Sequence, residues 1–215
     1  MLARFLFGFQ KFSISLPSIQ ILTSDDKKIS IKLKGISLHY ANALRRICLN
    51  GVPIFAIDTV DIIENTSVIP DEGLALTLGM IPLKTELNGF DESNSRVILV
   101  LDSEAAENTK IVTSAELESK DQVVKPISKQ IPIVHLAPGQ RIKLEAYARL
   151  GRGTEHAKWN SANISVLTNA DKEGEHILTV ETTGSLEPRQ IILAGIEELS
   201  KRLEEFKEIL VNLEE

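Results

Sequence analysis

The amino-acid sequence predicts an α+β fold, with a β-rich middle region between an early helix and a long C-terminal helix. Three observations support this prediction. Several segments alternate polar and apolar residues with a period of two, as half-buried strands do. One segment near the N-terminus has a helix-capping residue before it. The end of the chain repeats apolar residues every three or four positions, as an amphipathic helix does.

The first strand and the first helix follow one another closely. In residues 28–34 apolar side chains occupy every second position, which predicts a strand with one buried face. Ser37 is then placed to cap a helix that runs to about Asn50. Gly51 and Pro53 follow and are residues that commonly end helices.

The middle of the chain predicts a β-rich region with irregular loops. Strand-like patterns occur in residues 59–64, 97–101 and 141–149, and the last of these alternates most regularly. Pro138-Gly139 marks a turn before it. Residues 176–182 predict a further strand.

The final segment predicts a long helix that begins near Pro188, a residue suited to the first helical turn. Its apolar residues follow steps of 4, 3, 4, 3, 4 and 3, which is an a/d heptad pattern. We call these residues the C-terminal seam: Ile192, Ile196, Leu199, Leu203, Phe206, Leu210 and Leu213. The seam could pack on the protein's own sheet. A seam this narrow and long also favours a helix that packs part of the seam against another chain, because burial of all seven side chains would contribute roughly 10–20 kcal/mol.

Composition limits the classes of function. The net charge of −6 does not favour binding of phosphate backbones by the whole protein. Cys48 is the only cysteine, so an internal disulfide cannot form, and a cytoplasmic location fits. Residues 1–12 are apolar but interrupted, which favours a lead-in to the first strand over a targeting segment. No stretch approaches the roughly 20 apolar residues of a membrane span.

The sequence offers no constellation of catalytic residues. The four histidines are scattered, and Gly151-Arg152-Gly153 lacks the lysine and hydroxyl residue of a phosphate-binding loop. Asp58, Asp61 and Glu64 could line one end of a strand as metal ligands, which would suit a metal-dependent hydrolase. A solvated strand edge is the more ordinary interpretation of these carboxylates. We therefore expect no cofactor and no metal.

Two segments carry more unusual side chains. Asn42, Arg45 and Arg46 lie on the early helix, where adjacent arginines point about 100° apart. They suit recognition of carboxylates or backbone carbonyls at an interface, or are simply solvated.

The second segment is a loop at residues 150–159, which predicts an exposed interface loop with an aromatic anchor. Its candidate contact residues are Arg152, His156, Lys158 and Trp159. The competing interpretation is a stand-alone nucleic-acid-binding module in which Trp159 stacks on a base.

Several short blocks occur in one order and carry a resemblance to a known family. They are Asn42-Ala43-Leu44-Arg45-Arg46, Val52-Pro53, Ala56-Ile57-Asp58, Glu64-Asn65-Thr66-Ser67 and Leu78-Gly79-Met80-Ile81-Pro82-Leu83. Together they resemble the signature of the alpha-like RNA polymerase subunits, a family with bacterial, eukaryotic and archaeal branches. Residues 150–159 and Ile131-Pro132-Ile133-Val134 are most similar to the archaeal branch.

This resemblance implies a discontinuous dimerisation domain, residues 1–51 and 173–215, with a β-rich insertion domain at residues 52–172. It implies a non-catalytic scaffold in transcription that pairs with a smaller alpha-like subunit, called L in archaea. The platform would then bind the small subunits N and P and the second-largest subunit, and would meet DNA only through the complex. Asn42, Arg45 and Arg46 would contact a large subunit, and the dimer seam would comprise Ile192, Ile196, Leu199, Leu203, Phe206 and Leu210.

Two departures from the family pattern stand out. Where archaeal relatives often have Leu-Ala-His-Arg-Leu-Gly, this chain has Leu74-Ala75-Leu76-Thr77-Leu78-Gly79, without the polar pair. Some relatives carry a cysteine-rich insertion for an iron–sulfur cluster. The corresponding stretch here, around residues 102–123, contains no cysteine, so the ligand count excludes a cluster there.

Overall fold

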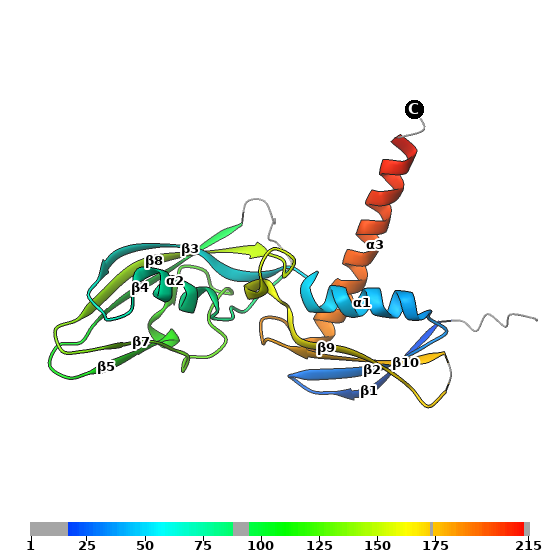
Figure 1. Cartoon of the computed structure of the whole chain (residues 1–215), viewed down its shortest axis with the longest axis horizontal. Coiled ribbons are helices and arrows are strands. Elements are labelled where there is room, and N and C mark those ends of the chain that lie inside the picture. Colours follow the sequence, from blue (N-terminus) through cyan, green and yellow to red (C-terminus); the bar gives the residue numbers. More distant parts are fainter. Residues whose placement is uncertain (1–16, 88–94, 173, 213–215) are drawn as a thin grey trace, which may run out of the picture.

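The computed structural model describes residues 17–87, 95–172 and 174–212. Within them the strands form two four-stranded sheets and one two-stranded sheet. The buried side chains gather in two hydrophobic cores. Figure 1 shows the elements as two halves, one around β3, β4 and β8 and the other around β2, β9 and β10. We call the two halves the first and the second module. The expectations for residues 1–12 and for Leu213 concern positions outside the described residues.

The first module is a four-stranded antiparallel sheet in the order β1-β2-β10-β9, with two helices on one face. Its elements are β1 (Ser18–Ser24), β2 (Lys28–Lys34), α1 (Leu38–Asn50), β9 (Ala162–Asn169), β10 (Glu175–Thr182) and α3 (Pro188–Asn212). The alternation in β2 places Ile29, Ile31 and Leu33 beneath the helices, where each is almost fully buried. Together with the inward side chains of the helices they belong to what we call the first core.

The second module contains the other strands and one short helix. Its four-stranded sheet has the order β3-β8-β4-β6, and a separate pair joins β5 to β7. The elements are β3 (Ile54–Asn65), α2 (Asp71–Gly79), β4 (Arg96–Glu104), β5 (Lys110–Thr113), a 3-10 turn (Ser114–Glu116), β6 (Glu118–Ser119), β7 (Pro132–Leu136) and β8 (Arg141–Gly151). Their inward side chains form the second core.

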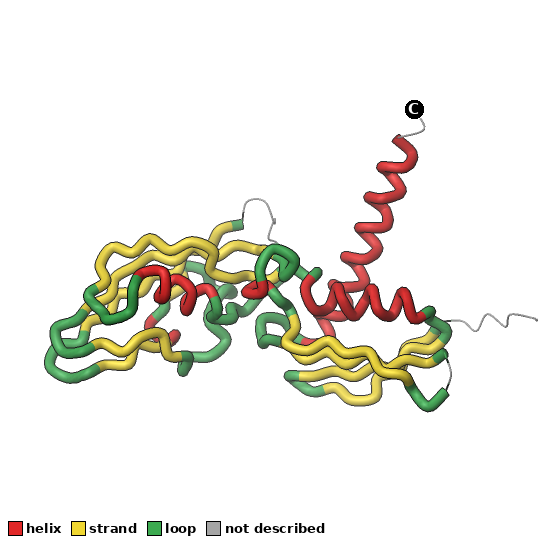
Figure 2. Tube along the Cα trace, in the orientation of Figure 1, coloured by secondary structure: helices red, strands yellow, loops and turns green. Residues whose placement is uncertain are grey.

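Strand β3 joins the two modules through its alternating side chains. Ile54 and Ala56 belong to the first core, whereas Phe55 and Ile57 belong to the second. Because successive side chains of a strand point to opposite faces, one short stretch of β3 is buried in both cores at once. This connection gives the two modules a shared, well-packed junction. Figure 2 shows the strands of the two modules as separate groups on either side of it.

The α+β prediction is confirmed, and the predicted strands and helices are present. Strand β2 has the predicted bounds, while β3 and β4 extend beyond them. Helix α2 and strands β1, β5, β6, β7 and β9 were not predicted. The three-part division at residues 51 and 172 stays a prediction, although the pairing of β9 with β10 favours an insertion that ends before β9. Among the described helices, none has the length and apolar content needed to cross a membrane.

Candidate interaction surface

Helix α3 is anchored at its N-terminal end by a close crossing with α1. Ile191, Ile192 and Gly195 are buried there. A β-carbon at Gly195 would lie 3.2 Å from the Cys48 sulfur and 3.5 Å from Leu44 Cδ1, so the glycine allows the two helices to approach closely. Burial also keeps the Cys48 thiol protonated, because it raises its pKa to about 12. Cys48 is therefore an inert core residue.

The C-terminal seam changes character along α3. Ile192 is 6% exposed and Leu199 packs partly against the first core. Beyond Leu199 the seam leaves the body of the molecule: Leu203 is 53% and Phe206 59% exposed. The other strongly exposed apolar side chains of the helix are Leu193, Ile196, Ile209, Leu210 and Val211. Figure 1 shows this part of α3 projecting away from both modules. An exposed apolar surface of this kind marks an interaction site.

Strand β1 adds apolar side chains to the face of the first-module sheet that carries α1 and α3. The register pairs Ile19 with Leu33 and Ile21 with Ile31, so both isoleucines point toward the face that carries α1 and α3. The helices do not cover β1, and the two side chains remain 53% and 54% exposed. This strand was not predicted from the sequence, although its alternating isoleucines were a usable signal.

The predicted contact residues on α1 point in different directions, as their spacing requires. Arg45 is half-buried: its Nε donates to Asn42 Oδ1 at 2.8 Å, and its guanidinium reaches the Ser165 carbonyl at 3.5 Å. The Ser165 hydroxyl in turn donates to the Arg45 carbonyl at 2.8 Å. Arg46 and Asn42 are exposed. Arg45 therefore fixes α1 to β9, whereas Arg46 faces solvent.

The loop at residues 150–159 is built around a buried tryptophan. Trp159 is 3% exposed, and its indole N–H donates to the Arg149 carbonyl at 3.3 Å. The cationic groups of Arg149 and Lys158 each lie 4.2 Å from the centre of its ring. A β-carbon at Gly151 would come within 2.5 Å of the ring, so only glycine fits beneath it. The prediction of an exposed aromatic anchor is therefore wrong for Trp159, because the loop needs the indole to close onto its own core.

Asp58 is held between the two cations that flank this tryptophan. Arg149 Nε and Lys158 Nζ each lie 2.9 Å from its carboxylate oxygens. Partial burial alone would raise the pKa of the Asp58 carboxyl, but the hydrogen bonds from Arg149 and Lys158 outweigh burial and lower the pKa. A carboxylate neutralised by two cations is a poor metal ligand. Within the described part of the chain, no three His, Cys, Asp or Glu side chains form a group that could hold a metal ion, and Asp58 is instead bound to Arg149 and Lys158.

The remaining predicted loop residues occupy two different environments. The exposed His156 accepts a hydrogen bond at Nδ1 from the Lys158 backbone N–H at 3.1 Å, which caps a 3-10 turn over Ala157–Trp159. Arg152 instead points toward the helices, where it hydrogen-bonds the Gly51 carbonyl and pairs with Glu198 of α3 at 3.0 Å.

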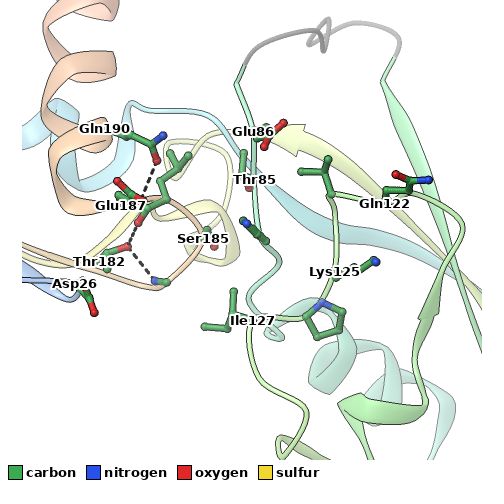
Figure 3. Close-up of a pocket in the computed structure, with 15 residues that line it drawn as sticks. Asp26, Thr85, Glu86, Gln122, Lys125, Ile127, Thr182, Ser185, Glu187 and Gln190 are labelled. Carbon is green, nitrogen blue, oxygen red and sulfur yellow. Dashed lines mark hydrogen bonds between the residues drawn. The ribbon is translucent and has the colours of Figure 1, made fainter.

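A cleft of about 650 Å³ lies at the junction of the two modules (Figure 3). Thr182 and Glu187 line one side, and Lys125 and Thr85 line the other. The Thr182 hydroxyl donates to the Leu186 carbonyl at 2.6 Å and accepts from the Gly184 N–H at 2.9 Å. This hydroxyl therefore holds the loop before α3 in place and is not paired with a base that would activate it as a nucleophile.

Helix α2 explains why the departure from the family motif is tolerated. Leu74 and Leu78 are fully buried in the second core, whereas Leu76 is 63% exposed. The Thr77 hydroxyl donates to the Gly73 carbonyl one turn earlier, at 2.9 Å. The two replaced positions therefore lie away from the core, and the fold does not depend on the missing polar pair.

Comparison with known proteins agrees with the family resemblance. The family described as the RNA polymerase Rpb3/RpoA insert domain matches residues 49–170, which is more than half of the chain. Among curated proteins, DNA-directed RNA polymerase subunit Rpo3 of Pyrococcus horikoshii is 47% identical over 146 residues, which cover 66% of this chain and 55% of that protein. Rpo3 of Aeropyrum pernix is 33% identical over 166 residues, covering 70% and 58%.

A third relative, Rpo3 of Pyrococcus furiosus, is also 47% identical over 146 residues, with 66% of this chain and 55% of the relative covered. The chain thus spans little more than half the length of these curated relatives. The match to the insert-domain family, the α+β fold and the Rpo3 relatives lead to one conclusion: this chain belongs to the archaeal branch of the alpha-like RNA polymerase subunits.

Proposed function

We propose that this chain is a non-catalytic assembly subunit of DNA-directed RNA polymerase. In this proposal the C-terminal seam pairs with the small alpha-like subunit L, and the resulting platform binds subunits N and P and the second-largest subunit. Asn42, Arg45 and Arg46 contact a large subunit, with Asn42 and Arg46 exposed and Arg45 half-buried. DNA is reached only through the assembled enzyme.

The observation that carries the proposal is the uncovered half of the C-terminal seam. Leu203, Phe206 and Leu210 are about half exposed, although they continue a heptad pattern whose first member, Ile192, is buried. Burial of such a side chain contributes about 1.5–3 kcal/mol. A partner helix that covered these three would gain roughly 5–9 kcal/mol of gross burial, before the entropy lost on association.

A stand-alone nucleic-acid-binding role receives no comparable support. That alternative depended on Trp159 as an exposed stacking platform, and the side chain is 3% exposed. Of its basic residues, Lys158 is paired with Asp58 and Arg152 with Glu198. Neither cation is available as an isolated phosphate contact.

The proposal is tested by measuring the affinity of the chain for purified subunit L. The double variant Leu203→Ser, Phe206→Ser removes two apolar contacts and should weaken binding by roughly 10²- to 10⁴-fold. Lys207→Ser, on the polar side of the same turn, is the matched control and should bind as the parent does. Equal affinity of the parent and the double variant would overturn the proposal.

A further inference from the structure

Arg152 links three parts of the first module although it lies in a loop. It follows β8, and its Nη1 group donates to the carbonyl of Gly51 at the end of α1 and pairs with Glu198 of α3 at 3.0 Å. The Arg152 and Glu198 side chains are only 17% and 12% exposed. An ion pair shielded to this degree is held in one geometry more firmly than a solvated pair.

The backbone that carries Arg152 is itself pressed against α1. The Thr154 N–H donates to the Asn50 carbonyl at 3.2 Å. A β-carbon at Gly153 would clash with Asn160 Oδ1 and would lie 2.7 Å from Asn50 Cβ, so the loop approaches α1 as closely as glycine permits. Arg152 is therefore presented from a rigid support, which is what an orienting residue needs.

Glu198 occupies the point where α3 leaves the body of the protein. Gly195 is buried and Leu199 half-buried, whereas every described residue from 200 onward is exposed. The exposed arm is roughly 20 Å long at 1.5 Å per residue. A tilt of about 10° at Glu198 would displace the end of an arm of this length by about 3 Å, enough to move a heptad side chain out of its partner's groove.

Besides the partial packing of Leu199 on the first core, two contacts hold α3 close to the point where the arm begins. One is the crossing at Gly195, where α3 touches α1. The other is the bond from Arg152 to Glu198, about one turn later. Arg202 also binds Glu198, at 2.8 Å, but it lies on α3 itself and cannot fix the helix relative to the rest of the molecule.

We propose that Arg152 is a positioning residue, which acts through Glu198 to hold the exposed arm of α3 in the direction that a partner subunit requires. This inference rests on the proposed function, because it assumes that the C-terminal seam receives a partner. It replaces the expectation that Arg152 touches the partner directly. Arg152 sets the fraction of molecules whose arm is ready to bind, and that fraction scales the apparent affinity.

Binding kinetics with purified subunit L separate the two roles. We compare Arg152→Met, Glu198→Gln and the double variant, with Arg202→Met as the matched control. If Arg152 positions the arm, each single variant lowers the association rate constant about five- to tenfold, with little change in the dissociation rate constant. The association rate constant of the double variant is no lower than that of either single variant, because both substitutions break the same contact. Arg202→Met has the same rate constants as the parent.

Other outcomes identify what has failed. A raised dissociation rate, or additive effects of the two substitutions, would mean that Arg152 contacts the partner, and would overturn the inference. Unchanged rates in both single variants would also overturn it. If instead Leu203→Ser, Phe206→Ser binds subunit L as the parent does, the proposed function itself fails. Circular dichroism establishes that each variant is folded before binding is measured.

A second measurement needs no partner. Spin labels on cysteines introduced at the exposed positions Lys129 and Lys207 report the distance between the second module and the arm. The buried Cys48 should remain unlabelled, and dilution with unlabelled chain restricts the signal to distances within one molecule. The distance distribution should be broader in Arg152→Met and Glu198→Gln than in the parent and in Arg202→Met. Identical distributions in all four proteins would contradict the inference.

Discussion

Replacement of Trp159 by alanine should destabilise the first module severely. The side chain is 3% exposed and lies in the first core. Truncation of a buried tryptophan to alanine typically costs about 3–5 kcal/mol through lost burial and the cavity that remains. The hydrogen bond to the Arg149 carbonyl and the contacts with two cations are lost as well. Since domain stabilities are about 5–15 kcal/mol, the change would remove a large share of the total.

Urea unfolding followed by far-ultraviolet circular dichroism measures this loss. Trp159→Phe keeps an aromatic ring but removes the indole N–H, and should cost less than the alanine variant. Thr154→Ala changes an exposed side chain in the same loop and should stay within about 0.5 kcal/mol of the parent. If Trp159→Ala unfolds at the same urea concentration as Thr154→Ala, the loop does not depend on the indole and our account of it is wrong.

Three further predictions concern Gly151, Asp58 and Cys48. Gly151→Ala should lower the free energy of unfolding, measured in urea, by about 1–3 kcal/mol, because the new methyl group would meet the Trp159 ring at 2.5 Å. An unchanged free energy of unfolding would contradict that contact. Because the folded-state pKa of Asp58 is lowered, its stabilising contribution is present at neutral pH and is lost as the pH falls below about 4. The free energy of unfolding of Asp58→Asn should therefore fall less than that of the parent between pH 6 and pH 3. Equal falls in the two proteins would refute this prediction. Cys48, with its pKa raised to about 12, should react with iodoacetamide only under unfolding conditions, and rapid alkylation of the native chain would contradict its burial.

The elements found from the sequence are those whose periodicity is strong and local. Strand β2 alternates without exception, and α3 keeps its heptad pattern for most of its length. Strand β1 alternates only at Ile19 and Ile21, and all of its residues are exposed, so its signal is short and weak. Helix α2 has only nine residues with a glycine in its first turn, which weakens the helical signal below recognition. Strand β9 is recognisable mainly through its pairing with β10, which is a long-range feature.

The candidate surface was only partly predictable for the same reason. The pattern of the C-terminal seam identifies an apolar stripe, but only the fold reveals that its burial ends near Leu199. Glycine, arginine and tryptophan in one loop resemble an interface hot spot in sequence. In three dimensions the same residues close the loop on Trp159 and direct Arg152 toward Glu198. Residue type alone cannot distinguish an exposed interface loop from a loop that packs on its own protein, because burial depends on segments more than 40 positions away in the chain.

The most direct test of the account is the mass of the species formed by the chain with and without subunit L. Sedimentation equilibrium should give a one-to-one complex when L is present, and self-association of the chain when L is absent, because the apolar arm is then uncovered. Leu203→Ser, Phe206→Ser should reduce both kinds of association. A chain that remains monomeric alone and also remains monomeric with an excess of L would contradict the central claim.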